Sequence, residues 1–200
     1  MKKEKIMNEP KKMSMVIERA KSNDYKALKE LIKSEQQKIY MTFYYLCPDC
    51  DDIADMTQDA LIKICKNIKN LKNPNSFSSW INTIVTRIFY DRMRKQSGMP
   101  QKISIEESSE TCPALQICDR GRTPEEKTIH EETDKIIKEM IYKLPENFRV
   151  VIVLREIAGL TYDEIAKATG IEPGTVKSRI SRSRNKLREC LEPYLDCLKG

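Results

Sequence analysis

The densest group of side chains able to act on another molecule lies near the C-terminus, at residues 177–188. Six of these twelve residues are Lys or Arg, and none is Asp or Glu. Cationic side chains at this density bind phosphate groups, and Arg and Lys also donate hydrogen bonds to the major-groove edge of guanine. A solvated basic face on an ordinary surface helix would carry the same charge, so the neighbouring segments have to decide between the two interpretations.

The residues just before this basic segment predict the two helices of a helix-turn-helix. Thr161 and Glu164 have the T-x-x-E spacing of a capping box, which predicts a helix start near Tyr162. Gly170 suits a left-handed end of that helix, and Pro173 suits the first position of the next one. An apolar stripe follows the second helix, made of Val176, Ile180, Leu187 and Leu191. Because a helix-turn-helix places its second helix in the major groove, the pattern predicts DNA binding.

The open face of this second helix supplies the predicted duplex contacts. They are Lys177, Ser178, Arg179, Ser181, Arg182, Arg184 and Asn185. Side chains on the face itself are expected to contact base edges, whereas Arg179 and Arg184 are expected to contact phosphates, which position the protein without specifying sequence.

The rest of the chain predicts helices throughout, because glycine is rare and alternating strand patterns are absent. Helical spacing covers residues 13–21, 25–46, 51–68, 77–95, 124–143, 146–158, 162–169 and the segment from 173 onward. We therefore expect an all-α fold with an N-terminal helical bundle, a flexible linker and a C-terminal helix-turn-helix domain. The expected boundaries are a basic tail at 1–12, the bundle at 13–98, an acidic linker at 99–125 and the helix-turn-helix domain at 126–200.

Composition excludes several classes of protein. The 200 residues carry a net charge of +6, with basic and acidic groups in separate clusters, which suits a protein that meets both a polyanion and another protein. The sequence has no run of 18 apolar residues and no secretory signal, so we expect a cytoplasmic protein. Glycine-rich phosphate loops, metal-ligand sets and Ser/His/Asp constellations are all missing from the sequence, which predicts no enzyme activity, no cofactor, no metal and no small-molecule substrate.

Seven cysteines, an odd number without framework spacing, predict reduced thiols. Cys47 and Cys50 form a C-x-x-C pair, but one pair cannot complete a four-ligand zinc site, and the single histidine, His130, is far along the chain. The favoured interpretation is a turn between helices with Pro48 at its start, and a metal or redox role is the weaker alternative.

Three blocks in this order resemble bacterial RNA polymerase sigma factors of the extracytoplasmic-function type. They are DIADMTQDALIKICKNI at 52–68, NSFSSWINTIVTRIFYDRMRKQ at 75–96, and LPENFRVVIVLREIAGLTYDEIAKATGIEPGTVKSRISRSRNKLR at 144–188. The resemblance implies a factor that binds core RNA polymerase, directs it to promoters through their −35 and −10 elements, and promotes DNA melting and transcription initiation. The main alternative is a stand-alone helix-turn-helix regulator that binds duplex operator DNA, although such a regulator has no need of the block at 75–96.

The resemblance also implies roles for individual residues. Docking to the clamp coiled coil of the largest polymerase subunit is implied for Asp52, Asp55, Gln58 and Asp59. Contact with the −10 element is implied for Asn75, Ser76, Phe77, Arg87, Tyr90, Asp91, Arg92, Arg94 and Lys95. Bases pulled from the duplex stack on aromatic side chains while cations follow the phosphates. Arg87 replaces the Asn that is frequent in the family's W-L-x-x-I-A-x-N pattern, so the −10 preference stays open.

Further partners are implied by the resemblance alone. They are the flap of the second-largest polymerase subunit and an anti-sigma factor, which in this family often holds the sigma factor at the membrane. The acidic linker is expected either to thread toward the RNA exit path or to act as a plain tether. Trp80 shares a stripe with Ile84, which favours a core position, whereas Tyr90 fits either a core or a DNA-facing position.

Overall fold

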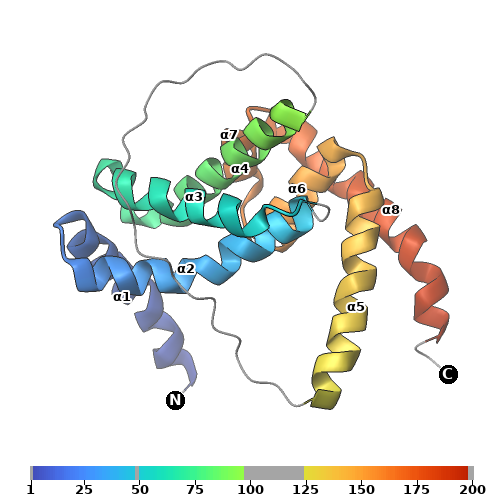
Figure 1. The fold of residues 1–200 in the computed structure, drawn as a ribbon, viewed down its shortest axis with the longest axis horizontal. Coiled ribbons are helices and arrows are strands. Elements are labelled where there is room, and N and C mark those ends of the chain that lie inside the picture. Colours follow the sequence, from blue (N-terminus) through green and yellow to red (C-terminus); the bar gives the residue numbers. More distant parts are fainter. Residues whose placement is uncertain (1, 48–49, 97–123, 198–200) are drawn as a thin grey trace.

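The computed structural model describes the backbone of residues 2–47, 50–96 and 124–197, and this part of the chain contains helices and no strand (Figure 1). The helices are α1 (Lys2–Lys21), α2 (Tyr25–Leu46), α3 (Ile53–Asn67), η1 (Ile68–Asn70), η2 (Pro74–Ser76), α4 (Phe77–Gln96), α5 (Pro124–Lys143), α6 (Glu146–Glu156), α7 (Tyr162–Thr169) and α8 (Pro173–Cys197). The all-α prediction is confirmed. Within these residues, every helix is too short or too polar to span a membrane.

The N-terminal half is a bundle built around α2. This helix packs against α1, α3 and α4, and its inward face contributes Leu31 and Phe43, which are fully buried. Ile64 of α3 and Phe89 of α4 meet them in the same core. Burial of this apolar surface stabilises the bundle.

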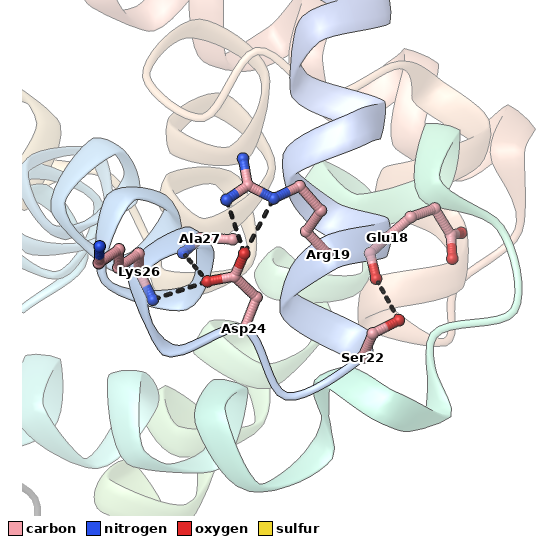
Figure 2. A network of polar contacts seen from close by, with 6 residues as sticks. All are labelled: Glu18, Arg19, Ser22, Asp24, Lys26 and Ala27. Carbon is pink, nitrogen blue, oxygen red and sulfur yellow. Dashed lines mark hydrogen bonds and ion pairs between the residues drawn. The ribbon is translucent and has the colours of Figure 1, made fainter.

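The corner between α1 and α2 is fixed by one carboxylate (Figure 2). Asp24 caps α2 by accepting hydrogen bonds from the backbone N–H groups of Lys26, at 3.0 Å, and Ala27, at 3.1 Å. The Arg19 guanidinium reaches the same carboxylate at 2.6 Å, and Asn23 adopts the left-handed φ of 66° that the tight corner requires. These donors hold the pKa of Asp24 below its ordinary value of 3.8, the Ala27 N–H having the largest effect.

The C-terminal half is a smaller helical unit. Helix α8 packs on α6 and α7, and α5 contacts α8 but diverges from it along its length (Figure 1). Its core is formed by the buried side chains Val150, Leu154, Ile165, Val176 and Ile180. The two halves also contact each other, because α4 packs against α7 and α2 packs against α6 and α5.

Two predictions about the N-terminal half differ from the structure. Helix α1 begins at Lys2 rather than near Met13. Lys, Glu and Met in its first turns favour a helix, although Pro10 inside it removes one backbone hydrogen bond. The expected reduced thiols are wrong for Cys47 and Cys50, which form a disulfide at the corner between α2 and α3. The expected acidic linker lies outside the described residues as far as 123, and α5 begins at Pro124.

Candidate nucleic-acid and polymerase interfaces

The turn between α7 and α8 has the local geometry that the sequence predicts. The Thr161 hydroxyl accepts a hydrogen bond from the Glu164 N–H at 3.3 Å, and the Glu164 carboxylate accepts one from the Thr161 N–H at 2.8 Å. This reciprocal capping box starts α7 at Tyr162. Gly170 ends α7 in the left-handed conformation, with a φ of 72°, and α8 begins at Pro173. The helix-turn-helix is therefore built by the residues that predicted it.

Helix α8 is held in one rotational setting by its inner face. Val176 and Ile180 are buried, with exposures of 0% and 1%. The Ser183 hydroxyl, also fully buried, lies 2.7 Å from the carbonyl oxygen of Arg179 and 3.1 Å from that of Phe148 on α6. Because these contacts fix which side of α8 is inside, they also fix which side chains face outward.

The outward face of α8 presents most of the predicted duplex contacts. Lys177, Ser178, Ser181, Arg182 and Asn185 are exposed on it. Arg179 is half-buried, and Arg184 donates to the Glu156 carboxylate of α6 at 2.6 Å. This carboxylate raises the pKa of Arg184 above its ordinary value. The DNA contacts of the exposed cationic face stay a prediction, whereas Arg184 already uses part of its hydrogen-bonding capacity on Glu156.

The segment predicted to contact the −10 element forms an exposed loop between two buried anchors. Leu71 and Phe77 are buried, whereas Asn75 and Ser76 of η2 are exposed. The Asn73 side chain caps η2 by accepting a hydrogen bond from the Asn75 N–H at 3.0 Å. The prediction that Phe77 contacts DNA does not fit this placement, because the residue is only 5% exposed and packs in the hydrophobic core.

Aromatic packing extends this anchor into α4. The ring of Trp80 stacks on that of Phe77 with centroids 6.2 Å apart, and Trp80 is half-buried against the core. The core position predicted for Trp80 therefore fits the structure better than a platform for a base.

The C-terminal half of α4 carries the remaining predicted −10 contacts. Arg87, Asp91, Arg94 and Lys95 are exposed. Arg94 pairs with Asp91 one turn earlier on the same helix, so that part of the positive charge is balanced locally. The cationic character of this surface thus rests mainly on Arg87 and Lys95.

Tyr90 lies at the boundary between the two halves of the molecule. It lines a shallow hollow together with Met93, Arg94 and Glu146, the last at the start of α6. Burial, followed by the nearby Glu146 carboxylate, raises the pKa of Tyr90 above its ordinary value of 10.0, and the charge of Arg179 acts in the opposite direction. Tyr90 of the N-terminal half therefore lies beside charged groups of the C-terminal half.

The predicted polymerase-docking residues occupy one exposed side of α3, with one exception. Asp55, Gln58 and Asp59 are exposed. Asp52, the residue before the helix, is half-buried and forms an ion pair with Arg92 of α4. A residue predicted to dock polymerase and a residue predicted to contact DNA thus bind each other. The acidic side of α3 still offers a surface for a basic partner.

Family comparisons match both halves of the molecule. Residues 31–98 match the family description Sigma-70 region 2, and residues 134–187 match Sigma-70, region 4. The ECF RNA polymerase sigma factor SigW of Bacillus subtilis is 33% identical over 178 residues, which cover 88% of this chain and 94% of that protein. The chain belongs to the extracytoplasmic-function sigma factors.

Two further similarities agree with this assignment. The ECF RNA polymerase sigma factor SigE of Mycolicibacterium smegmatis is 30% identical over 165 residues, and the match covers 82% of this chain and 62% of the length of that protein. The sigma factor RpoE from Bartonella quintana, solved with the anti-sigma factor NepR, has the same fold, with a TM-score of 0.61 and 24% identity over 82% of this chain and 96% of that chain.

Two supporting residues of the sigma region 4-like half carry no sequence signal. Arg155 donates to the carbonyl oxygen of Leu160 at 2.7 Å and stacks over the Tyr162 ring at 5.3 Å, which ties α6 to the start of α7. Arg149 is buried and lies over the ring of Tyr142 at 4.9 Å. Because such partners are distant carbonyls and rings, spacing along the chain cannot reveal them.

Proposed function

We propose that this sigma factor binds core RNA polymerase through α3 and selects promoters through two surfaces. The outward face of α8 contacts the −35 duplex, and the loop at η2 with the exposed part of α4 takes the −10 element as it melts. The observation that carries this proposal is the rotational setting of α8. Its buried face, Val176, Ile180 and Ser183, leaves the basic face open in a helix-turn-helix.

The −10 part of the proposal assigns base contacts to η2 and phosphate contacts to α4. Asn75 and Ser76 are exposed polar groups able to bond base edges, and Arg87 and Lys95 are exposed cations able to follow phosphates. The buried Phe77 holds the loop in place. Contacts made by bases that have left the duplex offset the stacking that these bases lose.

A transcription assay with purified core RNA polymerase tests the proposal. A library of promoter fragments is transcribed with and without the protein, and start sites are mapped by sequencing. We expect initiation only when the protein is added, from templates that share two elements. Absence of stimulation, combined with tight binding of duplex DNA by the protein alone, would instead establish the stand-alone regulator.

The polymerase-docking surface is tested by reversal of charge on α3. Asp55→Lys should lower the affinity for core polymerase about tenfold, because it places a cation against a basic partner. Glu30→Lys on α2 is the matched control, since Glu30 is also an exposed acidic residue and lies outside the predicted surface. Equal affinities of the two variants would contradict the docking role of α3.

Two further proposals follow from the family. We infer an anti-sigma partner, supported by the structural similarity to RpoE of Bartonella quintana, which was solved with NepR. We also infer a cytoplasmic location, since a factor that acts on polymerase has to reach chromosomal DNA. Affinity purification of the tagged protein from its host under non-inducing conditions should recover this partner, and recovery of polymerase alone would contradict the first inference.

A further inference from the structure

The corner between α2 and α3 brings together two cysteines of the hydrophobic core, each 8% exposed. The N–H of Cys47 donates to the carbonyl oxygen of Phe43 at 2.9 Å and closes α2, and the N–H of Cys50 donates to the carbonyl oxygen of Cys47 at 3.1 Å. The two Cα atoms are 5.5 Å apart, in the middle of the range that a disulfide needs. The positions of Cys47 and Cys50 therefore place the two sulfur atoms where they can bond.

Two cysteines at this spacing suit a reversible disulfide better than a disulfide whose role is to stabilise the fold. The ring closed by a disulfide between residues three apart is small, so it constrains little of the unfolded chain. Disulfides in a reducing cell interior are usually transient and redox-sensing. Once one cysteine has reacted, its neighbour is held beside it, which makes the second exchange step intramolecular.

The corner leads directly into the proposed polymerase-docking surface. Asp52 follows Cys50 by two residues, starts α3 and forms the ion pair with Arg92 of α4. Ile53 is buried behind it, and Asp55 stands exposed in the first turn of the same helix. A constraint on Cys50 is therefore a constraint on the first turn of α3, which contains the start of the docking surface.

We propose that Cys47 and Cys50 form a reversible thiol–disulfide site that sets the affinity of this sigma factor for core RNA polymerase. The disulfide form holds the start of α3 in place and docks more tightly, and the dithiol form docks more weakly. This inference rests on the proposed function, because it assigns the regulated step to polymerase docking.

The oxidant is a low-molecular-weight disulfide. The thiolate of one cysteine attacks a sulfur of this oxidant, forms a mixed disulfide and releases one thiolate of the oxidant. The thiolate of the other cysteine then attacks the sulfur of the first, forms the Cys47–Cys50 bond and releases the second oxidant thiolate. Two electrons pass from the protein to the oxidant, and the two protons lost by the cysteines are taken up by the released thiolates or solvent. A dithiol reductant reverses both steps.

The test uses the full chain equilibrated in buffers of reduced and oxidised glutathione. Alkylation followed by mass spectrometry of the peptide that contains both cysteines reports the disulfide, and fluorescence anisotropy reports binding of core polymerase. We expect the disulfide to form and to be reduced reversibly, with affinity for polymerase falling on the order of fivefold on reduction, the scale set by ordering the backbone of about one residue.

Three variants separate this site from the other thiols and from a folding defect. Cys47→Ala and Cys50→Ala should each remove the redox response and leave the affinity at the value of the reduced protein. Cys190→Ser, which changes an exposed cysteine on α8, should keep the full response. Circular dichroism of each variant checks that α2 and α3 remain folded, and the wild-type titration decides the proposal if a variant unfolds.

Two results would overturn the inference. The first is failure of the disulfide to form between these two residues in any glutathione buffer. The second is an equal affinity of the oxidised and reduced proteins for polymerase. If neither form binds polymerase, the proposed function fails, and so does the proposed link between the disulfide and polymerase affinity. The mass spectrometry still reports separately whether the disulfide forms reversibly.

Discussion

Two glycines in the helix-turn-helix should respond to the same substitution with opposite signs. Gly170 has a φ of 72°, in the left-handed region, whereas Gly174 lies in the first turn of α8 and has no such constraint. A Cβ atom added at either position would meet nothing within 4 Å, so steric clashes with neighbours do not contribute. The backbone alone therefore determines the outcome.

The expected changes in the free energy of unfolding follow from the different backbone conformations of the two glycines. Gly170→Ala forces an L side chain into the left-handed conformation and should lower the free energy of unfolding by about 1–2 kcal/mol. Gly174→Ala reduces the freedom of the unfolded chain and should raise it by about 0.4–1 kcal/mol. For a chain of this length, each kcal/mol shifts the Tm by about 2–4 °C.

Urea unfolding of the full chain, followed by circular dichroism, measures both changes. Gly170→Asn provides a graded control, because Asn tolerates the left-handed region better than Ala and should cost less. Stabilisation by Gly170→Ala, or a loss of equal size in both Ala variants, would refute the reasoning. Either result would mean that the turn between α7 and α8 does not depend on the left-handed residue.

Three further perturbations test other contacts. Arg182→Ala should cost roughly 1–3 kcal/mol at one or two base pairs of the −35 element in competition with single-base variants of the duplex, whereas equal weakening on every sequence would make Arg182 a phosphate contact. Exposed Lys167 of α7 offers the matched control variant, Lys167→Ala. Thr161→Ala should lower the free energy of unfolding by about 1 kcal/mol, and Thr161→Ser should restore most of it, since the capping hydroxyl returns; indistinguishable urea midpoints for the two would argue against the capping box. The pKa of Asp24 is lowered in the folded protein, so its carboxylate stabilises the fold above pH 3.8, and this stabilisation is lost as the pH falls through the lower folded pKa. The difference in free energy of unfolding between wild type and Asp24→Ala should therefore shrink below pH 3.8. A difference that stays constant down to pH 2 would show that the charge of Asp24 is irrelevant.

Local patterns in the sequence predict the helices of this sigma factor closely. The expected helix at 25–46 is α2, and the capping box, Gly170 and Pro173 lie at the ends of α7 and α8 as expected. These features depend on residues three or four apart, whose geometry is the same in any helix. The outward setting of Arg182 follows from the same periodicity, because the apolar stripe fixes the opposite face.

Contacts between distant segments could not be predicted in this way. The ion pair of Asp52 with Arg92 joins two residues to which the family assigns different partners. The Ser183 hydroxyl reaches the carbonyl oxygen of Phe148, 35 residues away, and nothing in the sequence distinguishes Ser183 from the exposed serines of the same basic helix. These contacts depend on how the helices pack, which the spacing of residues along the chain does not specify.

The packing of α4 against α7 can be compared with the length of a promoter. Elements centred near positions −35 and −10 are about 25 base pairs apart, which is roughly 85 Å of straight B-form duplex at 3.4 Å per base pair. In this structure, Tyr90 of α4 lies close enough to Arg179 of α8 for the charge of Arg179 to oppose the rise in the pKa of Tyr90 that burial causes.

Under the proposed function, one molecule in this arrangement therefore spans only one of the two elements. The segment from 97 to 123, which separates the halves, has 27 residues and a full contour length of roughly 90 Å. The chain between the halves is thus as long as the promoter spacing. Under the proposed function, the contacts of α4 with α7 and of α2 with α5 and α6 have to be released for both elements to be held at once.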